Sequence, residues 1–252
     1  GLRHLTGYPD QAPTRVGVSL GDSVAAMYAV IGAMMAIYHR DVKGAGKGQV
    51  IDVALYEAVF SLLEGALPEF DKVGAVRERT GTSLPGIAPS NTYECSDGKY
   101  IVIGGNGDAI FKRLMDVVGR PELGEDERYQ SNSGRAADAD FLDEVIEAWT
   151  KTVDFETALA KLDEARVPAG PIYSIEDIVK DPHYLSREMI QNFQLGEGET
   201  LKVPGVVPKM SETPGETKWL GPELGQHTDE VMKDWLTYDE EKIAALKAQG
   251  II

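Results

Sequence analysis

Residues 16–40 read VGVSLGDSVAAMYAVIGAMMAIYHR, and this stretch decides how the chain folds. A short apolar approach reaches Gly21 and Asp22, and a long apolar run follows at once. Gly21 lets the backbone turn tightly because it has no Cβ, and Asp22 and Ser23 are both favoured helix N-caps. The run is apolar nearly all round the helix, which is typical of a buried helix. We therefore expect a carboxylate at the positive end of a buried helix.

Two roles are open for Asp22 on this pattern. The first is structural, because an aspartate at the start of a helix commonly accepts hydrogen bonds from the first backbone N–H groups. The second is chemical, because a carboxylate oxygen can attack an activated acyl group and form a covalent intermediate.

Composition and charge limit the possible classes of protein. With 252 residues, 42% apolar and 26% charged, the sequence is typical of a globular protein of one or two domains. A net charge of −16 argues against nucleic acid as a partner. The apolar run before Arg40 is shorter than the roughly 20 residues of a membrane span, and no secretory signal is visible, so no membrane partner is expected.

Cysteine and histidine usage adds two expectations. Cys95 is the single cysteine, so an internal disulfide is excluded and a reducing compartment is favoured, which predicts a cytoplasmic protein. The four histidines form no pair with metal-ligand spacing, so no metal site is predicted.

The rest of the chain indicates an α/β protein in three segments. Residues 50–55, VIDVAL, resemble a buried strand, and residues 56–67 a helix, which suits an α/β layer. An Asp-Gly turn at 97–98 predicts a β-hairpin, and helical patterns follow it to residue 167. We expect residues 1–70 and 186–252 to form a large domain and residues 71–185 a small α+β domain with its linkers.

A second candidate site is the sequence GGNGD at residues 104–108. A predicted strand leads into it and a predicted helix leaves it, so its backbone N–H groups can face an anion or an oxyanion. A single glycine-rich turn is a weak signal, and a plain strand-to-helix connection is the alternative.

Several motifs resemble those of the family III CoA-transferases, the CaiB–BaiF family. They extend over nearly the whole chain: TGYPDQAPTRVGVSLGDS, GKGQVIDVALYEAV, DGKYIVIGG, RVPAGPIYSIEDIVKDP and LGQHTDEV. The resemblance implies that Asp22 is the nucleophile and that Gly104, Gly105, Asn106 and Gly107 form a mobile lid over the acyl-aspartyl intermediate.

The same resemblance implies a fold, an assembly and substrates. The family has a Rossmann-like large domain, whose N-terminal part this chain lacks, and an interlocked homodimer in which both chains complete each site. Coenzyme A thioesters are substrates rather than permanently bound cofactors, so the expected partners are an acyl-CoA and a small carboxylic acid. CoA would move through an aspartyl-acyl anhydride and an aspartyl-CoA thioester.

Two other functions stay open. The family also includes α-methylacyl-CoA racemases, whose pattern has a glutamate roughly where Gly107 stands. Gly107 cannot hold or donate a proton, which favours transfer over racemisation. The chain could also be a non-catalytic interaction partner that becomes active only with an N-terminal half.

Overall fold

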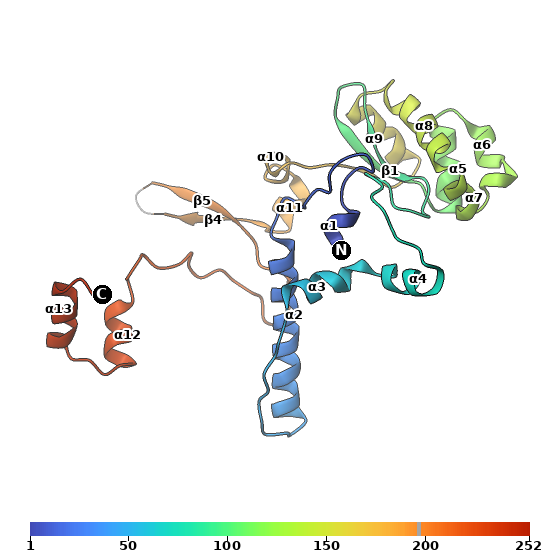
Figure 1. Ribbon diagram of the computed structural model, residues 1–252. Helices are drawn as coiled ribbons and strands as arrows, with labels where there is room; N and C mark the ends of the chain where they lie inside the picture. The colour runs from blue at the N-terminus through green and yellow to red at the C-terminus, as the bar shows by residue number, and fades with distance from the viewer. Residues whose placement is uncertain (196–197) are drawn as a thin grey trace. The chain divides into compact units, whose positions relative to one another are not determined.

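The computed structural model describes residues 1–195 and 198–252, which form two compact units, Gly1–Ile172 and Tyr173–Ile252 (Figure 1). Each unit is described by itself. The first begins with four helices, two of which continue into a turn of another helix type. They are α1 (Leu2–Leu5), α2 (Leu20–Ile37) with a π turn (Tyr38–Val42), α3 (Leu55–Phe60) with a 3₁₀ turn (Ser61–Leu63), and α4 (Ala66–Val73).

Helix α2 starts earlier than predicted. Ser19 is its N-cap residue, so Gly21 and Asp22 lie inside the first turn and Gly21 makes no tight turn. A Cβ on Gly21 would lie 3.4 Å from Val59 Cγ2, an ordinary contact with α3. The prediction that Asp22 or Ser23 caps the helix is therefore wrong.

Helix α2 is also much less buried than predicted. Only Val24, Ala25 and Ala36 are buried, whereas Met34 and Met35 are 60% and 67% exposed. Within this unit α3 and the segment before it cover one side of α2, where Val24 and Ala25 pack against Ala58. Most of the other apolar side chains of α2 are exposed in the described part of the chain, which is why the expectation of a buried helix fails.

Residues 50–55 do not form the predicted buried strand. Residues 51–54 belong to no helix or strand in the described structure, and Val50 is 94% exposed. This segment still packs on α2, since a Cβ on Gly32 would lie 2.8 Å from Ile51 Cγ2. The apolar residues of this segment thus pack against a helix and do not join a sheet.

The helical stretch from Leu20 to Val42 is 23 residues long and apolar enough to cross a membrane. That corrects the expectation that no stretch reaches this length. Core helices of globular proteins meet the same criteria of length and composition, so the stretch by itself is weak support for a membrane span.

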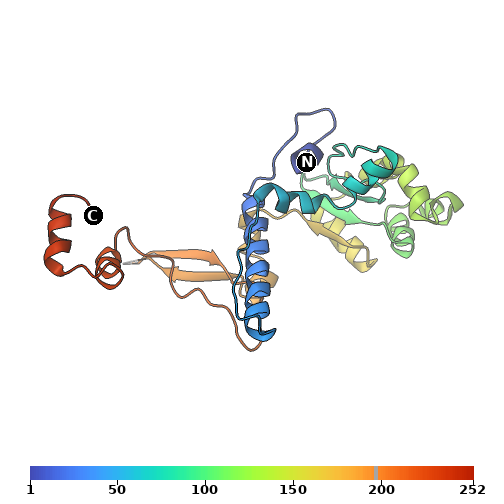
Figure 2. The same cartoon turned by 60° about the horizontal axis from the view of Figure 1, so that its bottom comes forward.

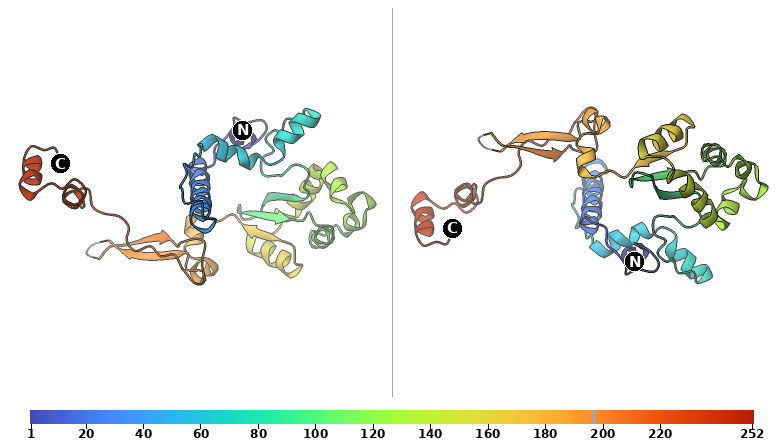
Figure 3. Two further views of the ribbon diagram at one scale, coloured as in Figure 1. Left: turned by 90° about the horizontal axis from the view of Figure 1, so that it is seen from below. Right: turned by 90° about the horizontal axis from the view of Figure 1, so that it is seen from above.

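A three-stranded antiparallel sheet organises the remainder of the first unit (Figure 3). The strands are β1 (Ser90–Glu94), β2 (Tyr100–Gly104) and β3 (Ala169–Pro171), in the order β1-β2-β3. Tyr93 pairs with Ile101, and Ile103 with Ala169. The hairpin at the Asp-Gly turn is confirmed, and Gly98 there has the positive φ of 78° that glycine adopts readily.

Helices between β2 and β3 complete the core of this sheet. Ile101 and Ile103 of β2 are fully buried against Leu114, Leu142 and Ile146. The core is continuous because most of these helices have an apolar side, whereas the helix at residues 132–137 buries only Arg135. The helices are α5 (Asp108–Val117), α6 (Pro121–Glu125), a 3₁₀ turn (Glu127–Tyr129), α7 (Asn132–Ala137), α8 (Ala139–Thr150) and α9 (Phe155–Glu164).

The second unit contains a long hairpin and short helices (Figure 2). Ser174 and Asp177 form a capping box, and Asp181 caps the helix that starts at Pro182, so a side chain caps each of these two helices. The elements are α10 (Ile175–Ile178), α11 (Pro182–Ser186), β4 (Ile190–Gln194), β5 (Thr200–Pro204), α12 (Thr228–Asp234) and α13 (Glu240–Ala248).

The chain therefore has a mixed α/β fold with small sheets, as expected from the sequence. The Rossmann-like large domain, the interlocked dimer and the domain limits at residues 70 and 185 stay predictions.

Candidate active site

Asp22 has an exposed carboxylate in the first turn of α2. Within the described residues it makes no hydrogen bond or ion pair, and it does not cap the helix. The backbone N–H groups of Gly21 and Asp22 also have no acceptor among the described residues, because Ser23 is the first residue whose N–H reaches a carbonyl one turn back, that of Ser19. The Asp22 carboxylate thus lies next to unsatisfied backbone donors at a helix N-terminus, where an anion or an oxyanion can be bound.

A cavity of about 360 Å³ surrounds Asp22. Its lining includes two arginines, Arg3 and Arg15, together with the apolar side chains of Leu20 and Val59. A second hollow of about 620 Å³ shares Arg3, Gly21 and Val59 with the first. It is lined further by residues of α3, namely Leu55, Tyr56, Glu57 and Phe60. The two hollows thus place positive charge and apolar surface on either side of Gly21.

The segment that carries Arg3 is held by contacts with residues far along the chain. Arg79 donates to the carbonyl oxygens of His4 (3.0 Å) and Tyr8 (3.3 Å). The N–H of Gly81 donates to the carbonyl of Gly7, whose φ of +117° is open to glycine. These bonds fix the wall of the cavity opposite α2.

The glycine segment, residues 104–107, links β2 to α5. The N–H of Gly104 donates to Pro168 O and that of Gly105 to Pro89 O, both at 2.8 Å. Those two N–H groups are therefore occupied and do not face an anion, contrary to the expectation for the whole segment. In the described structure the N–H groups of Asn106 and Gly107 have no acceptor, so they are the donors left for a ligand.

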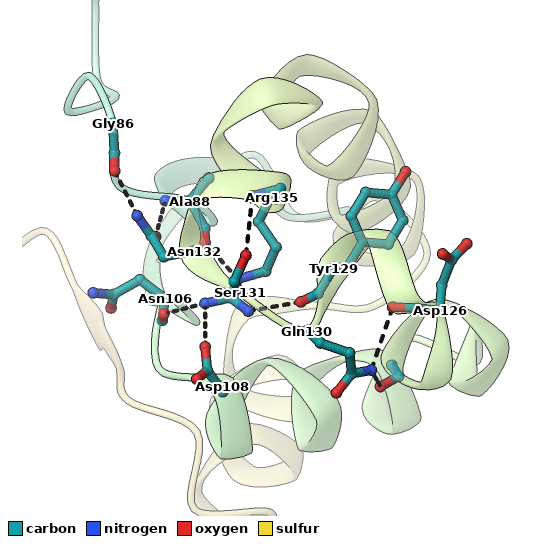
Figure 4. A network of polar contacts seen from close by, with 12 residues as sticks. Gly86, Ala88, Asn106, Asp108, Asp126, Tyr129, Gln130, Ser131, Asn132 and Arg135 are labelled. Carbon is teal, nitrogen blue, oxygen red and sulfur yellow. Dashed lines mark hydrogen bonds and ion pairs between the residues drawn. The ribbon is translucent and has the colours of Figure 1, made fainter.

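Helix α5 begins directly after the glycine segment. Gly107 is the N-cap residue, with φ −77° and ψ 138°, and Asp108 is the first helical residue. The Asp108 carboxylate accepts from Arg135 (2.8 Å) instead of capping the helix (Figure 4). Asp108 therefore uses its side chain in an ion pair, although aspartate is a favoured N-cap residue.

The chain does not bring the two predicted sites into one cavity. The lining around Asp22 comes from residues 2–22 and Val59, and it includes none of Gly104, Gly105, Asn106 and Gly107. Sequence reasoning also missed Arg3 and Arg15 as neighbours of Asp22. The position of Arg15 could have indicated this, since it stands in the PTRVG stretch shortly before the helix that carries Asp22.

The described residues contain no candidate metal site, because no group of three or more of their His, Cys, Asp or Glu side chains could hold an ion. Cys95 is buried and free, and burial raises the pKa of its thiol, which keeps it in the unreactive protonated form. We therefore see Asp22 as the nucleophile candidate with the best placement.

Comparison with known proteins identifies relatives of the chain. The chain is 42% identical over its whole length to the succinyl-CoA–D-citramalate CoA-transferase of Chloroflexus aurantiacus, of which it covers 62%. It is 34% identical to the succinyl-CoA:mesaconate CoA-transferase of Haloarcula hispanica, with 93% of this chain and 58% of the relative aligned. The chain thus spans about three fifths of the length of these relatives.

The fold comparison gives the same family. A CaiB/BaiF family protein from Brucella suis superposes with a TM-score of 0.76 at 31% identity, over 93% of this chain and 60% of that one. The sequence pattern of CoA-transferase family III matches residues 1–228. With the match covering most of its length, the chain belongs to CoA-transferase family III.

Proposed function

We propose that this chain carries the nucleophile and part of the substrate site of a CoA-transferase that moves CoA from an acyl-CoA donor to a small carboxylic acid. The observation that carries the proposal is the Asp22 carboxylate, which is exposed to a cavity and free of any partner in the described structure. Its side chain does not cap the helix, so capping does not account for an aspartate at this position.

The reaction follows from what a carboxylate can do to a thioester. An Asp22 oxygen attacks the thioester carbonyl, the C–S bond breaks, and CoA thiolate leaves an acyl-aspartyl anhydride. The thiolate then attacks the Asp22 carbonyl, releases the donor acid and forms an aspartyl-CoA thioester. The acceptor carboxylate attacks that thioester to give a mixed anhydride, and the returning thiolate takes the acceptor acyl group and frees Asp22.

The protein contributes by stabilising negative oxygen atoms and excluding water from the anhydride. The free N–H groups of Gly21 and Asp22 at the start of α2 are suited to an oxyanion on the Asp22 carbonyl. Arg3 and Arg15 supply positive charge for the acids. We propose the Asn106 and Gly107 N–H groups as further oxyanion donors, brought to Asp22 in the interlocked homodimer.

The substrates are proposed from the relatives' names. Relatives act with succinyl-CoA as donor and with D-citramalate or mesaconate as acceptor. A succinyl-type donor and a small dicarboxylate acceptor suit a cavity of about 360 Å³ with two arginines. We propose a cytoplasmic setting for this exchange, since acyl-CoA is the substrate and no permanent cofactor is required.

The test is to trap the intermediate. Incubation of the complete enzyme with succinyl-CoA, followed by hydroxylamine and peptide mapping, is expected to label Asp22. Asp22→Asn should lose the label and transfer activity while keeping most of its thermal stability, because the side chain has no hydrogen-bond or ion-pair partner among the described residues. A label on another residue, or full turnover by Asp22→Asn, would refute the assignment.

Two further arms separate the alternatives. Deuterium entering the α-carbon of a 2-methylacyl-CoA in D₂O, without movement of CoA between acids, would identify a racemase instead. Measuring CoA binding by this chain alone addresses the interaction-partner alternative, which tight binding would contradict.

A further inference from the structure

Arg135 of α7 is a charged side chain with no exposed surface. Its Nε donates to Ala88 O (3.1 Å) and Nη1 to Tyr129 O (2.7 Å). Nη2 donates to both Asn106 O (2.7 Å) and Asp108 Oδ1 (2.8 Å) (Figure 4). Burying a guanidinium is unfavourable unless every donor is satisfied, and an apolar residue would fill the same space at less cost. Three of the four acceptors are main-chain carbonyls, so Arg135 fixes backbone positions, which an apolar residue cannot do.

Helix α7 places this arginine by a close approach of two backbones. A Cβ on Gly134 would clash with the carbonyl oxygen of Arg128, so only glycine fits there. Ser131 caps the helix by accepting from the Gly134 N–H. The guanidinium also lies over the ring of Phe111, with Cζ 5.1 Å from the ring centroid. Its position is therefore fixed from several sides.

The bond to Asn106 sets the direction of the next N–H group. A peptide unit is planar and trans, so its C=O and N–H point in opposite directions. Because Asn106 O points to buried Arg135, the N–H of Gly107 points away from the guanidinium. This is one of the two N–H groups in the glycine segment that have no acceptor among the described residues.

Glycine at 107 makes the opposite orientation accessible. Rotating the Asn106–Gly107 peptide by half a turn would take Gly107 from φ −77° to a positive φ, which glycine adopts at little cost. The rotated peptide would present a carbonyl oxygen where an oxyanion needs a donor. A contact in the structure must therefore select one of the two peptide orientations. Arg135 is hydrogen-bonded to Asn106 O, the carbonyl whose direction distinguishes them.

We propose that Arg135 is a positioning residue that holds the Asn106–Gly107 peptide with its N–H outward, as an oxyanion donor for CoA transfer. The inference rests on the proposed function. Arg135 also holds the neighbouring chain, because it binds Ala88 O and the next residue, Pro89, accepts from the Gly105 N–H. One guanidinium thus supports both ends of the glycine segment.

The first experiment compares Arg135→Lys with Arg113→Lys in the complete enzyme. Arg113 is a matched control, since its guanidinium also binds main-chain carbonyls, those of Ala109 (2.9 Å), Ala165 (2.8 Å) and Arg166 (2.9 Å), but none of residues 104–107. Loss of one oxyanion donor lowers kcat about 10²–10³-fold, so Arg135→Lys should lose at least about tenfold with little change in KM. Amide exchange in a peptide covering 104–109 should accelerate. Arg113→Lys should change neither.

A second variant separates orientation from stability. Alanine at 107 tolerates φ −77° but not a positive φ, so Gly107→Ala in the Arg135→Lys background should restore part of the lost kcat. Its Cβ would lie 3.2 Å from Ile110 Cδ1, the end of a flexible side chain, so the fold is retained. A purely structural Arg135 predicts no such recovery, because the alanine adds nothing to the arginine's own contacts.

The outcomes decide the proposal in each case. Wild-type kcat and unchanged exchange in Arg135→Lys would overturn it, as would a loss of kcat that Gly107→Ala leaves unrestored. If Arg135→Lys fails to fold, Asp108→Ala removes one acceptor at an exposed position, and it should give a smaller loss of kcat with faster exchange. If the wild-type enzyme transfers no CoA and Asp22 is never labelled, the proposed function fails and the oxyanion role with it, while the exchange data still show whether Arg135 holds the segment.

Discussion

Gly105→Ala tests whether glycine at this position is required by packing. A Cβ there would lie 2.5 Å from Leu114 Cδ2 and 3.1 Å from Pro89 Cγ. Leu114 has no exposed surface and is part of the main core, so its methyl group has little room to move. The backbone of Gly105 has no positive φ, and conformational strain therefore adds nothing.

The expected cost is that of overpacking a filled core, about 1–3 kcal/mol in the free energy of unfolding. Gly104→Ala is the matched control, because its Cβ would meet nothing closer than 3.9 Å. It should be neutral or stabilise by up to about 1 kcal/mol, since alanine reduces the freedom of the unfolded chain. The two neighbouring substitutions are thus expected to differ in sign.

Urea unfolding measures the stability of both variants. The fluorescence of Trp149 is one probe, because this residue packs against the core that contains Leu114. Far-ultraviolet circular dichroism provides a second probe, because it reports mainly the helical backbone. Equal stability of the two variants would refute the reasoning, since it would mean that Leu114 and Pro89 yield freely to an added methyl group.

Two more predictions concern single hydrogen bonds. Tyr93 donates to Asp143 (2.6 Å), and burial, followed by the nearby Asp143 charge, raises the pKa of its phenol far above 10. The unfolded phenol ionises first, so stability should fall as the pH rises above about 10, and Tyr93→Phe should flatten that fall in alkaline unfolding curves. Asp154 caps α9 through the Thr157 N–H (2.8 Å), which lowers the pKa of its carboxyl. This stabilisation is present above the unfolded pKa of about 3.9 and is lost below it, so Asp154→Asn should lower Tm at pH 7 but not at pH 2.

The sheet and its helices could be predicted because their signals are local. The Asp-Gly turn sets the register of β1 and β2, and Leu142, Val145 and Ile146 recur at helical spacing and are buried together. Caps in the second unit follow the same rule, since the Ser174–Asp177 spacing is sufficient to form its box. Short β3 was missed because three residues carry no periodicity.

The start of α2 could not be predicted to the residue. Ser19, Asp22 and Ser23 are all good N-caps within five positions, and propensity does not choose between them. Burial of α2 and pairing of residues 50–55 depend on what covers them, which a periodic pattern does not specify. Arg135 gave no signal at all, because its burial comes from carbonyls that are distant in the sequence, such as that of Ala88.

The glycine segment is short and its two ends are firmly held, which limits how it can act as a lid. Ile103 before it and Phe111 after it are both buried in the main core. Gly104 and Gly105 are bonded to Pro168 and Pro89, so two peptide units remain to move. A covering motion that displaced the whole segment would break both bonds and withdraw Asn106 O from a buried guanidinium, leaving that donor unsatisfied at a cost of roughly 1–3 kcal/mol or more. Rotation of the Asn106–Gly107 peptide alone would keep the Gly104 and Gly105 bonds, but it too would withdraw Asn106 O from Arg135, so the bond that orients the Gly107 N–H also opposes this motion.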